Sequence, residues 1–251
     1  MTNFFITGSD TGVGKTWFTV AFMGALKRKG LSVMGMKPIA TGAEKIKDKL
    51  INEDAKLIMQ NCSQRVSYNL VNPFVFELPS SPHVAAKHQG TVIDLDQIIK
   101  NYNILRSMAD VVVVEGIGGW RVPITDEYYL SEFVKRLDLS VILVAGIRLG
   151  CINHAILTVE AIRSDGHSLC GWVSNRLDRV YSHGEETVKI IKKRLNCPKL
   201  ILLLKISKTL TSNNCANKKA VPDPIAILID IRSWKLVENN SVNKTPVKKP
   251  K

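Results

Sequence analysis

Four consecutive valines at residues 111–114 constrain the fold more than any other feature of this sequence. A strand with one face in water alternates apolar and polar residues, whereas an unbroken β-branched run indicates a strand covered on both faces. Similar apolar runs occupy residues 3–7, 32–37, 140–145, 169–174 and 200–206. Helical patterns lie near residues 15–29, 53–61, 94–108, 128–137, 152–165 and 184–195. This alternation predicts an α/β fold, a three-layer, doubly wound and mostly parallel sheet with helices on both faces.

A glycine-rich segment, GSDTGVGKT at residues 8–16, stands between the first predicted strand and the first predicted helix. This order of strand, loop and helix is that of a phosphate-binding loop of the nucleoside-triphosphatase type. Backbone N–H groups of Gly12, Val13 and Gly14 would surround a phosphate, and the helix N-terminus adds a positive dipole. Lys15 would reach the β- and γ-phosphates, and the Thr16 hydroxyl would bind Mg²⁺. The loop therefore predicts a nucleoside triphosphate as a co-substrate and Mg²⁺ as a cofactor.

Charged residues at the ends of other predicted elements could complete such a site. Glu115 ends the valine strand and precedes GIGG, as the second metal anchor of a phosphate-loop protein requires. Asp54 opens a helix, where an acid is also explained by the helix dipole alone. Lys37 follows the second strand and would point toward the nucleotide, although a surface lysine fits the pattern equally well. Asp10 would either bind Mg²⁺ or orient the loop.

The basic charge of the chain is concentrated near its end. Residues 205–251 contain ten Lys or Arg and three Asp or Glu, and so hold +7 of the net charge of +13. We expect a single domain over residues 1–206 and a basic C-terminal tail over 207–251 that is partly disordered, with one further strand near 225–231. The tail has one aromatic residue, Trp234, and no series of aromatic residues interleaved with its charges, so no nucleic-acid partner is expected. Without a signal sequence or an apolar span, we expect a cytoplasmic protein and no membrane partner.

Further blocks between residues 3 and 176 give the sequence a resemblance to the dethiobiotin synthetase family. The loop fits the family pattern G-[ST]-D-T-x-V-G-K-[TS]. The general phosphate-loop pattern G-x-x-x-x-G-K-[ST] would place its first glycine at position 9, where this chain has Ser9, and Gly8 lies one residue earlier. Two blocks, GIGGW at 116–120 and LGCINH at 149–154, are specific to that family rather than general to phosphate-loop proteins. The other matching blocks are KPIATG at 37–42, NEDA at 52–55, VNPF at 71–74, SSPH at 80–83 and GWVSN at 171–175.

The resemblance implies an ATP-dependent cyclo-ligase of biotin biosynthesis, which joins 7,8-diaminopelargonate and CO₂ into the ureido ring of dethiobiotin through a phosphorylated carbamate. It implies that Lys37 and Lys15 act in catalysis and that Thr16, Asp54 and Glu115 bind Mg²⁺. Asn175 and Arg176 would join the loop residues in binding ATP. The resemblance also implies a homodimer, in which the loop after the fourth strand reaches the partner's substrate. The implied substrate residues are Thr11, Thr41, Ser81, Gly118, Leu149, Gly150, Cys151 and Asn153.

Some features depart from the family pattern or allow another reading. Residues 203–208 read LLKISK and lack the glycine and proline of the family's G-x-[IL]-P segment over adenine, so we assign no nucleotide contact beyond Arg176. One alternative function is a nucleotide-switch ATPase of the partition or septum-positioning type. Such proteins usually carry an early loop lysine, where this chain has Ser9, Asp10 and Thr11. Another alternative is a weakly active synthetase.

Overall fold

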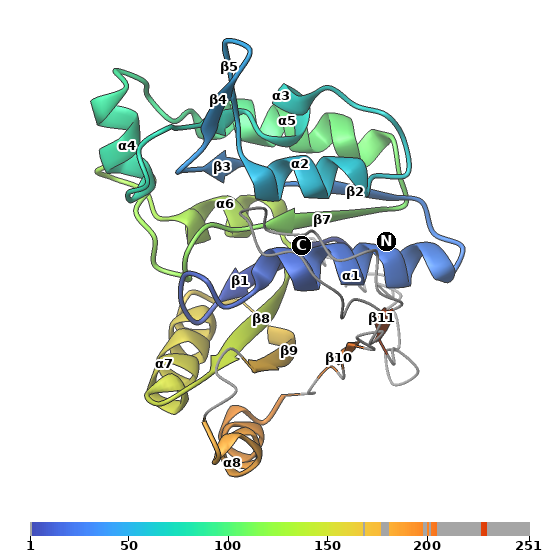
Figure 1. Cartoon of the computed structure of the whole chain (residues 1–251), viewed down its shortest axis with the longest axis vertical. Coiled ribbons are helices and arrows are strands. Elements are labelled where there is room, and N and C mark those ends of the chain that lie inside the picture. Colours follow the sequence, from blue (N-terminus) through green and yellow to red (C-terminus); the bar gives the residue numbers. More distant parts are fainter. Residues whose placement is uncertain are drawn as a thin grey trace, which may run out of the picture.

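A parallel sheet forms the centre of the computed structural model (Figure 1), which describes residues 2–167, 169–176, 181–197 and 200, and the backbone of 202–204 and 227–229. The strand order is β2-β7-β1-β8-β9, and each neighbouring pair is parallel. The strands are β1 (Phe4–Gly8), β2 (Val33–Met36), β7 (Val111–Glu115), β8 (Ser140–Ile147) and β9 (Leu169–Arg176). The predicted parallel α/β fold is confirmed.

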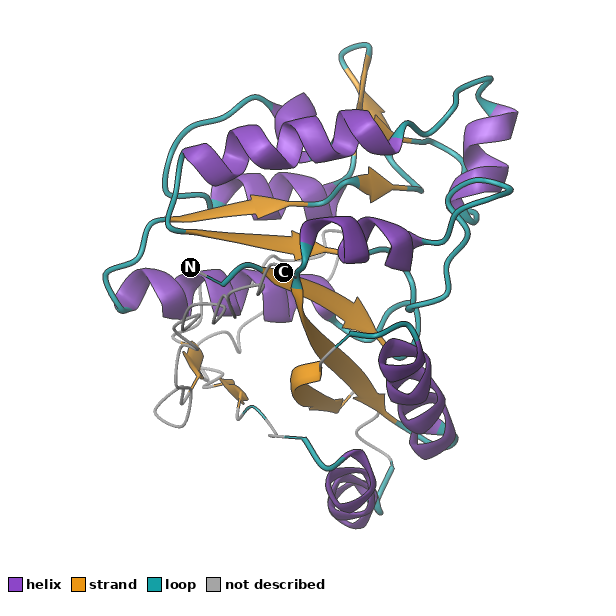
Figure 2. Cartoon of the chain, turned by 180° about the vertical axis from the view of Figure 1, so that it is seen from behind, coloured by secondary structure: helices purple, strands orange, loops and turns teal. Residues whose placement is uncertain are grey.

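Both faces of β7 are buried, as its valine run predicts. Val111 and Val113 pack with residues of α1 (Lys15–Arg28) and α2 (Glu53–Gln60). Val112 and Val114 point to the opposite face, against α5 (Leu95–Ser107) and α6 (Leu130–Leu137). The reverse view shows α5, α6 and α7 (Cys151–Ser164) on that second face (Figure 2). α8 (Gly184–Leu195) packs beside α7 over β8 and β9.

Several short elements were not predicted from the sequence. They are α3 (Tyr68–Val71), α4 (Pro82–His88), the parallel pair β3 (Ile39–Ala40) and β6 (Phe74–Val75), and the exposed hairpin of β4 (Glu44–Ile46) and β5 (Lys49–Ile51). Each is too short to produce a periodic pattern of apolar residues. The two strands predicted at residues 200–206 and near 225–231 correspond to β10 (Leu202–Leu204) and β11 (Ile227–Ile229), which pair antiparallel. The rest of the predicted tail lies outside the described residues.

The carboxyl ends of the parallel strands meet at one edge of the sheet, and the functional residues gather there. β1 runs into residues 8–14, β2 runs into Lys37, and β7 ends at Glu115. Met36 pairs with Val114, so Lys37 and Glu115 follow at neighbouring positions. Open parallel sheets bind their ligands at this edge. No helix among the described residues is long and apolar enough to cross a membrane.

Candidate active site

The loop between β1 and α1 has the backbone geometry of a phosphate cradle. Gly12 and Gly14 have positive φ angles of 72° and 90°, a region that side chains disfavour. Gly14 is the N-cap of α1 and provides no side-chain hydrogen bond to the first turn. The first N–H groups of a helix have no partner within it, so those of α1 are available to an anion.

Asn175 at the end of β9 supports this loop from the side. Its Nδ2 atom donates to the carbonyl oxygen of Val13 over 2.9 Å. A Cβ atom on Gly14 would lie 2.3 Å from the same Nδ2 atom. Gly14 is therefore required both by its backbone angle and by the approach of Asn175. Arg176, the next residue, is exposed and forms an ion pair with Glu185.

Lys15 and Asp10 link the two ends of the loop. The Lys15 ammonium is buried and donates to the backbone oxygen of Asp10 over 3.1 Å. Burial, and then the charge of Lys37, lower the pKa of Lys15 to about 8, against the opposing effect of nearby carboxylates. The Asp10 carboxylate accepts a hydrogen bond from the N–H of Thr11 and forms an ion pair with Arg148. Asp10 therefore orients the loop in this structure.

An ion cluster with a buried Lys37–Glu115 pair at its centre lies below the loop. The Lys37 ammonium is 2.6 Å from Oε1 of Glu115 and 2.9 Å from Oδ2 of Asp54. The Thr16 hydroxyl donates to the same Glu115 oxygen over 2.9 Å. Burial alone would lower the pKa of Lys37, but the charges of Glu115 and Asp54 outweigh it and raise that pKa. Burial would raise the pKa of Asp54, whereas the Lys37 charge and hydrogen bonds from Lys37 and Thr16 lower it. Lys37 is therefore a fixed cation at neutral pH.

The second carboxylate oxygen of Glu115 differs from the first. Glu115 is fully buried, and its Oε2 atom has no hydrogen-bond partner among the described residues. A buried polar atom without a partner is costly unless a donor or a cation completes it. Two carboxylates and one hydroxyl beside a phosphate loop form a donor set of the kind that Mg²⁺ prefers.

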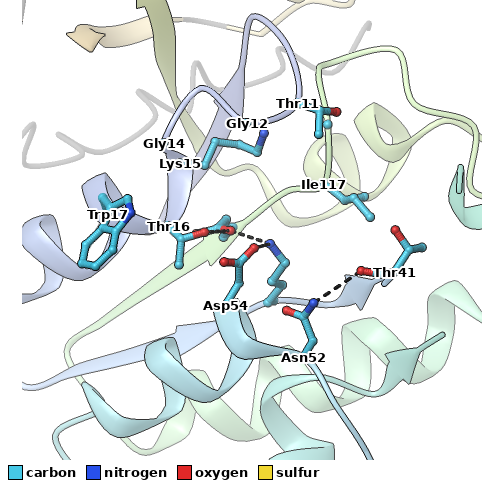
Figure 3. Close-up of a pocket in the computed structure, with 13 residues that line it drawn as sticks. Thr11, Gly12, Gly14, Lys15, Thr16, Trp17, Thr41, Asn52, Asp54 and Ile117 are labelled. Atoms are coloured by element: carbon cyan, nitrogen blue, oxygen red, sulfur yellow. Dashed lines mark hydrogen bonds and ion pairs between the residues drawn. The ribbon is translucent and has the colours of Figure 1, made fainter. Parts of the chain in front are cut away.

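A pocket of about 330 Å³ joins the loop to this cluster (Figure 3). Ten of the residues singled out from the sequence line it: Thr11, Gly12, Gly14, Lys15, Thr16, Lys37, Thr41, Asp54, Glu115 and Gly118. The structure thus brings the predicted phosphate, metal and catalytic residues to one cavity, together with part of the predicted substrate set. Val13 is buried behind the loop, and Ser81 is an exposed residue preceding α4 that does not line this pocket.

The remaining substrate residues lie at the start of α7, outside the pocket lining. Leu149 is 86% exposed, Gly150 has a φ of 88°, and Asn153 is exposed. Cys151 is only 2% exposed because its side chain packs in the core with Ala155. Its backbone N–H donates to the carbonyl of Arg148 over 3.1 Å. Within one chain, the thiol of Cys151 is therefore not available to a ligand.

Trp17, Asn52, Ile117 and Arg148 were not predicted as site residues. The first three line the pocket, and Arg148 pairs with the loop through Asp10. The side chain of Asn52 caps α2 by accepting from the N–H of Ala55, and it donates to the carbonyl of Thr41 over 3.4 Å. An Asn before a helix is a recognisable cap signal, and its place in NEDA could have identified it. Arg148 follows β8 with no such local signal.

These features define a class of protein. A strand, a glycine loop ending in Lys-Thr, a helix and a buried acid on the neighbouring strand characterise a phosphate-loop enzyme that uses ATP. The AAA domain family AAA_26 matches residues 2–209.

Relatives identify the family more closely. A protein of Vibrio parahaemolyticus is 44% identical over 197 residues, or 78% of this chain and 86% of that protein. One of Aromatoleum aromaticum is 43% identical over 196 residues, 78% and 87% of the two chains. Both are named ATP-dependent dethiobiotin synthetase BioD. The chain belongs to the dethiobiotin synthetase family.

Solved structures give a more distant likeness. The cell division protein MinD of Aquifex aeolicus superposes with a TM-score of 0.47 and 17% identity over 79% of this chain and 80% of that chain. A ParA family ATPase of Chlorobium tepidum TLS gives 0.45 and 15% over 79% and 84%. The alternative of a partition or septum-positioning ATPase is less supported than the synthetase function, because relatives at 43–44% identity are named dethiobiotin synthetases.

Proposed function

We propose that the pocket between residues 8–16 and Lys37 closes the ureido ring of dethiobiotin from 7,8-diaminopelargonate, CO₂ and ATP. One amine of the substrate adds to CO₂ and becomes a carbamate. The γ-phosphoryl group of ATP passes to the carbamate oxygen, giving a carbamic–phosphoric anhydride and ADP. The second amine attacks the carbamate carbon, the ring closes and phosphate leaves. The family relationship supports this reaction, and the buried Lys37 cation in the pocket is the structural observation that carries it.

Lys37 and Lys15 have complementary tasks in this proposal. Lys37 is held by Glu115 and Asp54, so its charge is fixed before substrate arrives and can stabilise the carbamate anion. Lys15 binds the phosphates and stabilises the negative charge on the phosphoryl group during transfer. Such preorganised charges act strongly in a buried site because they need no reorganisation during the reaction. Thr11, Thr41, Ser81 and the backbone near Gly118 would hold the carbamate and the amines.

We further propose that Thr16, Asp54 and Glu115 hold Mg²⁺. The Glu115 Oε2 atom without a described partner and the adjacent Thr16 hydroxyl fit this role. When bound, the ion would neutralise charge on the ATP phosphates. Asn175 would recognise adenine, since its Nδ2 atom already binds the Val13 carbonyl and its side-chain oxygen could accept from the adenine amino group. Arg176 would contact the nucleotide from the same strand end.

The catalytic unit is proposed to be a homodimer of cytoplasmic chains with the synthetase domain in residues 1–206. The span of the family match, residues 2–209, supports the domain boundary. Leu149 and Asn153 are exposed at the start of α7, and neither lines the pocket that contains Lys37 of the same chain. This exposure supports a role for them in binding the substrate of the partner protomer. Gly150 would offer its backbone N–H group to the substrate carboxylate, whereas the N–H of Cys151 donates to the carbonyl of Arg148 over 3.1 Å, so Cys151 would act by fixing this turn.

Phosphate release tests the reaction. The protein with Mg-ATP and bicarbonate should release phosphate only when diaminopelargonate is added, and mass spectrometry should detect dethiobiotin. Lys37→Ala should abolish turnover while substrate binding stays measurable by calorimetry. ATP hydrolysis at the same rate with and without the diamine would instead favour a switch ATPase.

Mixing two variants tests the proposed dimer. Lys37→Ala and Asn153→Ala should each be inactive alone, and their mixture should recover part of the activity if each site combines Lys37 of one protomer with Asn153 of the other. No recovery would contradict the shared-site dimer.

A further inference from the structure

Trp17 is the one aromatic side chain that lines the nucleotide pocket among the described residues. It follows Lys15 and Thr16 directly in the first turn of α1. Trp17 is 47% exposed, whereas Phe18 and Phe22 on the same helix are 1% and 0% exposed and stack with ring centroids 5.6 Å apart. The helix thus places two aromatic rings in the core and leaves the third in the pocket wall. A large exposed aromatic surface beside a binding loop suits an apolar or aromatic ligand group.

The position of Trp17 in the pocket indicates which ligand group it meets. In Figure 3, Trp17 and Gly14 lie at one side of the pocket, whereas Thr41 and Ile117 lie at the other. Asn175 is packed against Gly14, so the side with Trp17 is also the side of the strand end that we assign to the base. The γ-phosphate must face Lys37 and the diamine. The remainder of the nucleotide then leaves the loop toward Trp17.

We propose that the indole of Trp17 packs against the nucleoside of ATP and supplies part of the nucleotide affinity. This inference rests on the proposed function only in taking ATP as the ligand. Aromatic stacking on a base is tolerant of base identity because every base offers a π-face. Trp17 therefore contributes affinity without discrimination, whereas the amide of Asn175 distinguishes adenine from other bases.

Binding of two ligands to three variants tests this role. Calorimetry would measure Kd for Mg-ATP and for inorganic tripolyphosphate, which lacks the nucleoside. Trp17→Ala should weaken ATP binding about tenfold, equal to about 1.4 kcal/mol, and leave tripolyphosphate binding unchanged. Trp17→Phe should restore most of the ATP affinity. Tyr129→Ala, which removes another exposed aromatic residue outside this pocket, is the matched control and should leave both Kd values unchanged.

Fluorescence gives a second readout. The chain has four tryptophans; Trp120 and Trp172 are 3% and 0% exposed, and Trp234 lies outside the described residues. The contribution of Trp17 is therefore read as a difference between proteins: Trp17→Phe should lose most of the ATP-induced quenching that the unmodified chain shows. An unchanged ATP Kd in Trp17→Ala would overturn the proposal, as would an equal loss for ATP and tripolyphosphate, because that loss would mean a distorted loop. Binding is measured without the diamine, so a failure of the ring-closing reaction would leave this test intact.

Discussion

Replacing Lys37 with Met should destabilise the protein strongly while keeping the length of the side chain. Lys37 is 4% exposed and holds the fully buried Glu115 through a 2.6 Å contact. Removing one partner of a buried ion pair costs about 3–5 kcal/mol because the other charge stays buried without compensation. The Asp54 side chain is 48% exposed and can recover water, so it adds little to the loss.

The size of this effect is measurable by thermal and urea unfolding. For a chain of this length each kcal/mol shifts Tm by about 2–4 °C, so Lys37→Met should melt roughly 6–20 °C lower. Adding Glu115→Gln removes the stranded charge and should restore most of the stability. Lys45 pairs with Asp48 on the exposed β4–β5 hairpin at 3.5 Å, and Lys45→Met should change the free energy of unfolding by less than about 1 kcal/mol.

Two results would refute this reasoning. One is a Lys37→Met protein as stable as the unmodified chain, which would mean that Glu115 finds water or another donor. The other is a double variant no more stable than Lys37→Met, because the loss would then come from packing rather than charge. Lys37→Met should lack turnover in either case, so stability and activity report separate properties of one residue.

The remaining predictions concern the loop and a histidine. Thr16→Ala should lower kcat about 10²-fold or more, whereas Thr16→Ser, which keeps the hydroxyl that donates to Glu115, should keep most of the activity; equal losses in a phosphate-release assay would argue against the hydroxyl. Arg148→Met should raise the ATP Kd less than about fivefold, because its ion pair with Asp10 is partly exposed, and a larger calorimetric change would indicate direct contact with ATP. Burial lowers the pKa of His167, against the opposing charge of Asp165, below the value of about 6.5 that the residue has in the unfolded chain. The unfolded chain therefore binds a proton at His167 more readily than the folded chain does. The free energy of unfolding should therefore fall as the pH drops below 6.5, and His167→Gln should weaken that dependence in urea titrations; an unchanged slope would contradict it.

Much of the fold and the centre of the site follow from the sequence for simple physical reasons. Runs such as residues 111–114 and 141–145 are buried on both faces, and parallel strands bring their carboxyl ends to one edge. Lys37 comes directly after β2, and Glu115 is the last residue of β7. Because Met36 pairs with Val114 in the β2–β7 register, the residues that follow them, Lys37 and Glu115, lie side by side. The glycine loop fixes Lys15 and Thr16 beside them. These residues are predictable because local pattern and sheet geometry place them together.

Other contacts depend on packing that no local pattern encodes. Arg148 meets Asp10 only because β8 lies beside β1, with Gly8 opposite Val144, and because the chain continues beyond the sheet. Trp17 falls in a helical pattern where an aromatic residue is ordinarily buried, so only the structure reveals it in the pocket wall. The β3–β6 pair has two residues per strand, too few for any period.

The contact between Gly14 and Asn175 also limits how this chain can change over time. A side chain at position 14 would meet the amide at 2.3 Å even before its unfavourable φ of 90° is considered. A substitution at position 14 could therefore be accepted only after position 175 had become smaller, and even then against backbone strain. A shorter residue at 175 would in turn leave the Val13 carbonyl without its donor. The two positions, 161 residues apart in the chain, are thus expected to vary together or not at all among descendants of this sequence.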